Sequence, residues 1–250
     1  LKMKNKILIS TGGSGGHVIP AITIYDHLKS NYEILISTDL RGLQYIDKEN
    51  YKPITINTPK LNNLFLLPFA LSKVLFLTFK CLILLKKEKI SILVSTGGYM
   101  SLPLCFAAKI LGVKIYLFEP NMVLGRANKF FLNFLKKILS YSKNLINLPK
   151  KFEQKKIIIR PLIRKNYYEK NNIPKKDSLF SIIIIGGSQG ASIFDNFINE
   201  IIVNISKIFS LKVIHQTSKK NIYSLKNFYK ENKIENKVFN FDQNLNKLLR

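Results

Sequence analysis

The chain is poor in the residues that metal sites, disulfide scaffolds and acidic catalytic clusters use. It has no tryptophan, two cysteines, three histidines and only 15 acidic residues among 250. Cys81 and Cys105 lie far apart in apolar runs, so we interpret both as core residues in a reducing compartment and exclude a zinc site or a redox pair. Because no Asp-x-Asp pair could hold a divalent ion, we predict no metal and no cofactor.

Long uninterrupted apolar runs and secretion signals are also missing. The N-terminus passes through one short apolar run into a glycine loop, which does not fit a signal peptide, so we expect a cytoplasmic protein. The stretch 64–85 has spanning length, but Pro68, Lys73 and Lys80 interrupt it before about 18 uncharged apolar residues accumulate. The two lysines share one helix side, which suits a helix lying on an anionic bilayer. An ordinary packed helix whose lysines reach solvent fits equally well.

Positive charge is what the chain has in excess. Lys and Arg number 40 against 15 acidic residues, a formal net charge of +25. Such a surplus favours an anionic partner, whether nucleic acid, a membrane surface or a phosphorylated substrate. Only five of these residues are Arg, whereas proteins that recognise nucleic acid through bidentate contacts favour Arg. A nucleic-acid-binding protein is therefore the weaker alternative, and we predict no nucleic-acid partner.

Apolar stretches alternate with helical ones, as in a parallel sheet covered on both faces. Strands are predicted at 6–10, 33–37, 53–57, 90–95, 113–118, 179–185 and 211–215. Helices are predicted at 20–30, 64–85, 102–111, 127–139 and from the glycine loop near 190 to 209. The polar, basic stretch 143–170 contains two prolines and is the predicted domain junction.

Two segments of the chain have the same sequence pattern and form an internal repeat. Residues 7–22 and 182–197 both form the series strand, Gly-Gly-Ser-x-Gly turn, helix. Their matching glycines, Gly13 and Gly187, are separated by roughly the size of one α/β domain. We therefore predict two doubly wound parallel-sheet domains, at 1–158 and 159–250, of which the second is incomplete.

Each glycine loop should place free backbone N–H groups at a helix start, where phosphate binds favourably. Neither loop ends in the Gly-Lys-Ser/Thr of a P-loop, which excludes ATP hydrolysis. The dinucleotide pattern G-x-G-x-x-G fails at Val18, although Asp39 could imitate its ribose-binding acid, so an NAD enzyme stays a weak alternative. His17 closes the first loop and could act as a general base on a hydroxyl. A capping or packing histidine is the competing interpretation.

Three loops together resemble the glycine loops of the MurG family of peptidoglycan N-acetylglucosaminyltransferases: TGGSGGH (11–17), TGGYMSLP (96–103) and GGSQGA (186–191). FEPNMVLGRANKF (118–130) and HQTSK (215–219) resemble two further segments, in the family's order. The resemblance implies a GT-B fold of two Rossmann-like domains. Its N-terminal domain, 1–158, would bind the lipid-linked acceptor and the membrane, and its C-terminal domain, 159–250, would bind UDP-N-acetylglucosamine.

The resemblance also implies a reaction and its residues. N-acetylglucosamine would pass, with inversion, from UDP to the 4-hydroxyl of undecaprenyl-pyrophosphoryl-N-acetylmuramoyl-pentapeptide (lipid I to lipid II). This would happen at the cytoplasmic face of the bacterial inner membrane, with the protein attached peripherally. The family's proposed base falls on His17. Its contacts to the donor fall on Gly13, Ser14, Gly15, Asn121, Arg164 and Ser188.

The chain departs from the family pattern in three places. Phe118 and Pro120 replace the His and Gln that flank the glutamate, and Arg160-Pro161-Leu162 replaces Gly-Asn-Pro before Arg164. The family's later motifs, which hold the ribose and the sugar, have no counterpart in these 250 residues. We therefore expect the chain alone to be inactive. A non-catalytic remnant that binds nucleotide or a membrane surface is the alternative.

Overall fold

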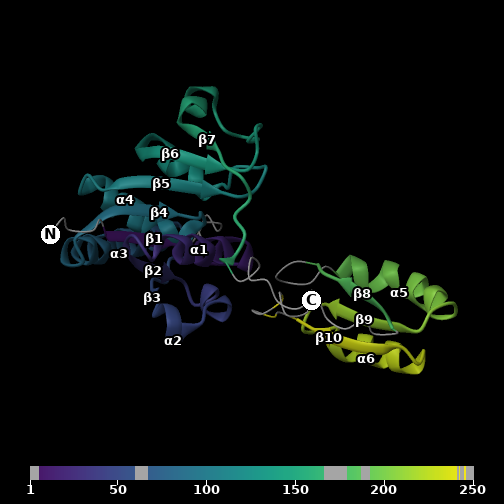
Figure 1. The fold of residues 1–250 in the computed structure, drawn as a ribbon. Helices are drawn as coiled ribbons and strands as arrows, with labels where there is room; N and C mark the ends of the chain where they lie inside the picture. Colours follow the sequence, from purple (N-terminus) through teal and green to yellow (C-terminus); the bar gives the residue numbers. More distant parts are fainter. Residues whose placement is uncertain are drawn as a thin grey trace. The chain divides into compact units, whose positions relative to one another are not determined.

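The computed structural model describes residues 6–59, 67–165, 179–186, 192–240, 242 and 245. The chain divides into two compact units, Leu1–Lys165 and Asn166–Arg250, and each contains its own parallel sheet (Figure 1). This division falls seven residues after the boundary suggested by the sequence. The expected α/β class with two parallel-sheet units is confirmed.

The sheet of the first unit has seven strands, all paired in parallel, in the order β3-β2-β1-β4-β5-β6-β7. They are β1 (Lys6–Ser10), β2 (Glu33–Thr38), β3 (Ile54–Thr55), β4 (Ile90–Ser95), β5 (Lys114–Glu119), β6 (Leu135–Ser140) and β7 (Lys156–Ile158). The strand order reverses between β1 and β4. Doubly wound sheets bind their ligands at the carboxyl ends of the strands at such a reversal.

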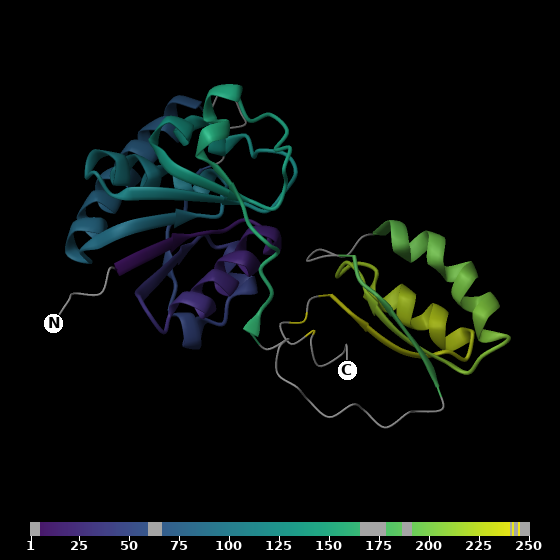
Figure 2. The same cartoon turned by 45° about the horizontal axis from the view of Figure 1, so that its top comes forward.

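Helices and short 3₁₀ turns cover this sheet. They are α1 (Gly15–Leu28), η1 (Gly42–Tyr45), α2 (Lys48–Tyr51), α3 (Leu67–Lys87), η2 (Tyr99–Ser101), α4 (Leu102–Ile110), η3 (Ala127–Phe134) and η4 (Lys150–Lys155). Figure 2 shows α1 (purple) on one face of the sheet and α3 and α4 (blue) on the other. Leu8 and Leu93 pack with the side chains of α3 and α4, whereas their neighbours Ile7 and Val94 lie on the side of α1. Because both faces are covered, the strands are nearly continuous apolar runs.

The second unit has three parallel strands in the order β10-β9-β8. Its elements are β8 (Phe180–Ile184), α5 (Ser192–Ser206), β9 (Leu211–Gln216), α6 (Ile222–Glu231) and β10 (Glu235–Phe239). Ile202, Val213, Tyr229 and Val238 form part of its core. Two successive strand–helix–strand units thus account for the described part of this sheet.

Several sequence-based elements need correction. The helix predicted at 127–139 is wrong, because the chain forms η3 and then β6 there. Leu and Ile among lysines in 135–140 fit a strand as well as a helix, and pairing with β5 decides for the strand. The first helix begins at Gly15 instead of Pro20, since the amide of Val18 already bonds to the carbonyl of Ser14. The sequence-based assignment also missed several short elements, namely η1, α2, η2, η4, β7, α6 and β10.

Candidate functional site

The first two glycine loops leave the sheet side by side. Ser10 of β1 pairs with Ser95 of β4, so the residues that follow both strands emerge at the same edge. The amide of Thr96 donates to the carbonyl of Ser10 (3.0 Å), and the Thr96 hydroxyl donates to that of Thr11 (2.8 Å). The structure therefore joins two motifs that lie far apart in the sequence, at the point where the strand order reverses.

His17 lies in the first turn of α1 and is half-buried. Its Nδ1 atom lies 2.6 Å from the carbonyl oxygen of Thr96. Because a carbonyl oxygen can only accept, Nδ1 carries the proton and donates it, and the Nε2 atom of the neutral ring keeps a lone pair. The ring can therefore take up a proton at Nε2, which is what a general base requires.

Some polar groups of the first loop are hydrogen-bonded within the protein, and others are available to a ligand. The amide of Gly13 donates to Asp39 Oδ1 (2.8 Å), and the amide of Ser14 donates to the Gly12 carbonyl (3.1 Å). The amides of Gly15 and Gly16 belong to the first turn of α1, so the helix itself offers them no acceptor. The Ser14 side chain makes no capping hydrogen bond. An anion at this loop would therefore meet the amides of residues 15 and 16 and the Ser14 hydroxyl.

Asp39, at the carboxyl end of β2, holds the first loop in place. Its side chain is buried, and Oδ1 accepts the amides of Gly13 and Gly42, both at 2.8 Å. Oδ2 pairs with the Arg41 guanidinium at 2.8 and 2.9 Å. Both oxygens are thus engaged within the protein, which does not fit the ribose-binding role that the NAD alternative needs. The sequence signal for a carboxylate that holds a glycine loop is an acid directly after the strand beside that loop.

A second buried carboxylate organises the segment after β5. Glu119 is fully buried, and its Oε1 accepts the backbone amide (3.3 Å) and the side-chain amide (2.9 Å) of Asn121. Its Oε2 accepts the amide of Gly125 (3.0 Å) and Nδ2 of Asn128 (2.8 Å). Four N–H donors therefore satisfy the charge. Asn121 is exposed with its Nδ2 held by the carboxylate, so its side-chain oxygen is the atom available to a ligand.

Phe118, which replaces a family histidine, is a core residue in this structure. It is fully buried and makes an edge-to-face contact with Tyr141, with 5.3 Å between ring centroids. The neighbouring Glu119 nevertheless keeps its full set of hydrogen bonds. With Phe at residue 118, the four hydrogen bonds of Glu119 still organise the following segment.

The two remaining predicted donor contacts are Ser188 and Arg164. Ser188 falls outside the described residues. Burial raises the pKa of the Tyr51 hydroxyl, and the charge of Arg164 opposes that shift, so Arg164 lies near Tyr51. The adjacent Ile163 carbonyl lies 2.8 Å from Nε2 of His27, which is about 15 Å along α1 from His17. The first unit thus does not bring Arg164 to its glycine loops, and a donor contact for Arg164 stays a prediction.

A buried polar network lies at the carboxyl end of β9. Asp195 Oδ2 accepts hydrogen bonds from the Thr217 hydroxyl and from Nδ2 of Asn221, both at 2.6 Å. The ring of His215 lies between Asp195 Oδ1 (3.3 Å from Nε2) and the Tyr229 hydroxyl (2.8 Å from Nδ1). Burial lowers the pKa of His215, and the Asp195 charge opposes the shift. His215 and Thr217 therefore connect β9 to Asp195 of α5, and Asp195 also holds Asn221 in the turn before α6, a structural role that the 215–219 motif did not indicate.

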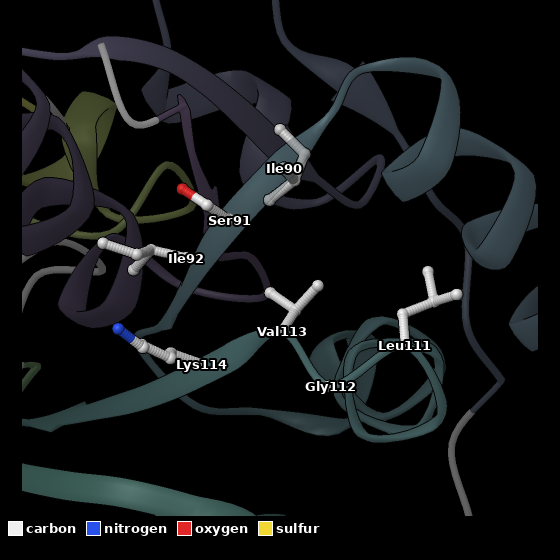
Figure 3. Close-up of a pocket in the computed structure, with 7 residues that line it drawn as sticks. All are labelled: Ile90, Ser91, Ile92, Leu111, Gly112, Val113 and Lys114. Carbon is white, nitrogen blue, oxygen red and sulfur yellow. The ribbon is translucent and has the colours of Figure 1, made fainter. Parts of the chain in front are cut away.

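Two cavities of the first unit lie away from these loops. One, of about 300 Å³, lies at the amino ends of β4 and β5, the edge opposite to Thr96 (Figure 3). The other, of about 320 Å³, lies on the α1 face and is lined mainly by apolar side chains such as Ile24 and Tyr116. Among the described residues, no group of three or more His, Cys, Asp or Glu could hold a metal ion. The candidate site therefore rests on the loops themselves.

A doubly wound unit with paired glycine loops at its strand reversal, followed by a second parallel α/β unit, defines a GT-B-like protein. The chain belongs to glycosyltransferase family 28. Residues 7–140 match the glycosyltransferase family 28 N-terminal domain, and residues 181–250 match the glycosyltransferase family 28 C-terminal domain. The resemblance read from the loops is thereby confirmed.

Curated relatives share one name, UDP-N-acetylglucosamine–N-acetylmuramyl-(pentapeptide) pyrophosphoryl-undecaprenol N-acetylglucosamine transferase. That of Pelagibacter ubique is 46% identical over 244 residues, which cover 97% of this chain and 68% of the relative. That of Rickettsia canadensis is 34% identical and covers 96% of this chain and 69% of the relative. The chain thus spans somewhat more than two thirds of each.

Solved structures show the same fold at low sequence identity. MurG of Acinetobacter baumannii aligns with a TM-score of 0.64 and 20% identity, over 98% of this chain and 70% of that protein. UDP-GlcNAc 2-epimerase of Neisseria meningitidis, bound to UDP-GlcNAc, aligns with a TM-score of 0.60 and 12% identity, over 98% and 74%. One fold therefore serves two activities, and the sequence relatives have to distinguish them.

Proposed function

We propose that the chain, when extended by the C-terminal part that its relatives carry, acts as an inverting N-acetylglucosaminyltransferase of peptidoglycan synthesis. It transfers N-acetylglucosamine from UDP-N-acetylglucosamine to the 4-hydroxyl of undecaprenyl-pyrophosphoryl-N-acetylmuramoyl-pentapeptide and releases UDP. The observation that carries this proposal is the 46% identity to the Pelagibacter ubique relative of that name across 97% of the chain. The geometry of His17 at the strand reversal supports it.

His17 is the proposed base. As the sugar hydroxyl attacks the anomeric carbon, Nε2 takes its proton and the bond from that carbon to the UDP oxygen breaks. The ring keeps its Nδ1–H bond to the Thr96 carbonyl, which holds its orientation and also stabilises the imidazolium that forms. In this mechanism the dipole and backbone amides at the start of α1 take the place of a metal ion in stabilising the negative charge on the departing diphosphate.

The helix start after the first loop stabilises that charge. The amides of Gly15 and Gly16 lie at the positive end of the α1 dipole, and the Ser14 hydroxyl can add a hydrogen bond. Gly13 contributes mainly its backbone conformation (φ +80°), since its amide is held by Asp39. Asn121, Arg164 and Ser188 complete the proposed donor contacts. In this proposal residues 1–158 bind the acceptor and the membrane, and residues 159–250 bind the donor.

Helix α3 supplies a proposed attachment surface for the membrane. Ala70, Val74, Cys81 and Leu85 are buried on one side, and Cys81 and Leu85 belong to the same core as α4. The remaining surface is also apolar, with exposed side chains at Phe69, Leu75, Phe76, Phe79 and Ile83. A packed helix of a water-exposed surface would carry polar residues there.

The charges around α3 fit a peripheral attachment. Lys73 and Lys80 lie within the helix, and Lys86 and Lys87 end it. Among the described helices, Pro68–Lys87 is long and apolar enough to cross a membrane by length and composition, with a mean hydropathy of 1.8. Its buried side, packed within the first unit, favours a helix that lies on an anionic cytoplasmic surface instead of spanning the bilayer.

Transfer is tested directly with labelled UDP-N-acetylglucosamine and the lipid acceptor. The assay compares the 250-residue chain with an extended chain, in which the C-terminal third of the Pelagibacter ubique relative follows residue 250. We expect the extended chain to move label into the lipid with a β linkage. The inactivity of the unextended chain stays a prediction, which the same assay tests.

Two results would count against the proposal. Donor binding by the extended chain without any transfer would favour the non-catalytic alternative. Conversion of the donor to its C2 epimer would show that the chain shares the activity named for the epimerases of this fold.

A further inference from the structure

The carbonyl that orients His17 belongs to an unusual turn. The Thr96 carbonyl and the Gly97 amide share one planar peptide unit, so whatever holds one end also aims the other. The Gly97 amide donates to the buried hydroxyl of Ser95 (3.1 Å). Gly97 and Gly98 have φ of +93° and +92°, a conformation that side chains with a Cβ rarely adopt.

Asn128 packs directly against this turn. A Cβ added at Gly97 would lie 2.8 Å from Nδ2 and 3.1 Å from Oδ1 of Asn128. The Asn128 side chain is fully buried, and its Oδ1 has no hydrogen-bond partner among the described residues. A buried amide oxygen without a donor is unfavourable, so stability alone does not account for an asparagine here.

Glu119 fixes Asn128 in that position. Its Oε2 accepts a hydrogen bond from Nδ2 of Asn128 at 2.8 Å, and the backbone amide of Asn128 donates to the Gly125 carbonyl at 3.0 Å. The same carboxylate holds Asn121, a proposed donor contact, through Oε1. One buried carboxylate thus connects the segment after β5 to the turn after β4.

We propose that Asn128 and Glu119 are positioning residues for His17. They hold the Thr96–Gly97 peptide so that its carbonyl keeps the proton on Nδ1 and leaves Nε2 free to act as the base. This inference rests on the proposed role of His17. Neither residue needs to touch the substrate. A small tilt of that peptide would misplace the base, and misplacements of about 1 Å can cost a hundredfold in rate.

The tautomer of His17 can be measured without any turnover. The chain has only three histidines, so ¹⁵N labelling of their rings gives a simple spectrum in the unextended chain. In the wild type we expect His17 to be protonated at Nδ1. In Asn128→Ala we expect a mixture of both tautomers, with the signals of His27 and His215 unchanged as evidence of folding. Asn133→Ala is the matched control, because Asn133 is an exposed asparagine in η3, the same 3₁₀ helix that contains Asn128.

The catalytic consequence is measured in the extended chain. We expect Asn128→Ala to lower kcat by about tenfold or more, with KM for the donor nearly unchanged. Ser95→Ala, which releases the Gly97 amide from the other side, should act in the same way and serves if Asn128→Ala does not fold.

Three results would overturn the proposal: an unchanged tautomer in both variants, a changed tautomer with unchanged kcat, or a lowered kcat with an unchanged tautomer. Failure of the proposed function would appear separately, as absence of transfer by the wild-type extended chain while the tautomer result still stands.

Discussion

His17 Nδ1 and the carbonyl oxygen of Thr96 lie 2.6 Å apart, so a single hydrogen bond joins the first turn of α1 to the end of β4. The contact satisfies one ring nitrogen and leaves the other with a lone pair. The N-cap of α1 is Ser14, so His17 does not cap the helix. A packing histidine would also pair its ring N–H with an acceptor, so the role of His17 as a base stays a proposal.

The turn that carries this carbonyl should tolerate no side chain. Gly97→Ala places a Cβ 2.8 Å from Asn128 at a φ of +93°, which combines backbone strain with overpacking, and should cost at least about 2 kcal/mol of stability. Gly112→Ala is the matched control, because its φ is +68° but nothing lies within 4 Å, so it should cost about 1 kcal/mol. Hydrogen exchange of the β1 and β4 amides measures the stability of both variants. Equal losses of stability in Gly97→Ala and Gly112→Ala would show that the contact with Asn128 is loose.

The second unit should lose stability on mild acidification. Because burial lowers the folded-state pKa of His215, the unfolded chain is the first to take up a proton as the pH falls below about 6.5. The stability that the second unit gains from keeping His215 neutral is therefore fully present above pH 6.5. It is lost as the pH falls toward the lower folded-state pKa of His215. Hydrogen exchange of β9, corrected for intrinsic rates, should show this slope, and His215→Gln should flatten it. A slope that persists in the variant would place its origin elsewhere.

The lysines around α3 should contribute to membrane binding. Replacing Lys73, Lys80, Lys86 and Lys87 by Gln should weaken binding to anionic vesicles by up to about 1 kcal/mol per charge, because the proposed attachment would bring each of them near the bilayer surface. The control removes the same charge from the second unit, at Lys226, Lys230, Lys233 and Lys237. Vesicle sedimentation measures both proteins. Equal losses would indicate a general charge effect, and release by detergent alone would indicate a spanning helix.

Local sequence patterns were sufficient to predict an element where its own residues determine its structure. The strands 6–10 and 90–95 were predicted with the bounds that the structure shows, since each is an apolar run ended by Ser, Thr and glycines. The region 127–139 was predicted wrongly because pairing with β5, which lies outside the segment itself, determines the conformation of residues 135–140. The site followed the same rule. Motifs indicated His17, but its acceptor lies 79 residues away in the chain, and no local pattern shows that contact.

The most direct test of the central claim is the turnover of His17→Gln in the extended chain. Glutamine can still donate to the Thr96 carbonyl but cannot act as a base, so kcat should fall by about a hundredfold or more while KM for UDP-N-acetylglucosamine stays nearly unchanged. His27→Gln, the same change near the other end of α1, should transfer at the wild-type rate. If His17→Gln also kept the wild-type kcat, the histidine would be a packing residue and the proposed mechanism would be wrong.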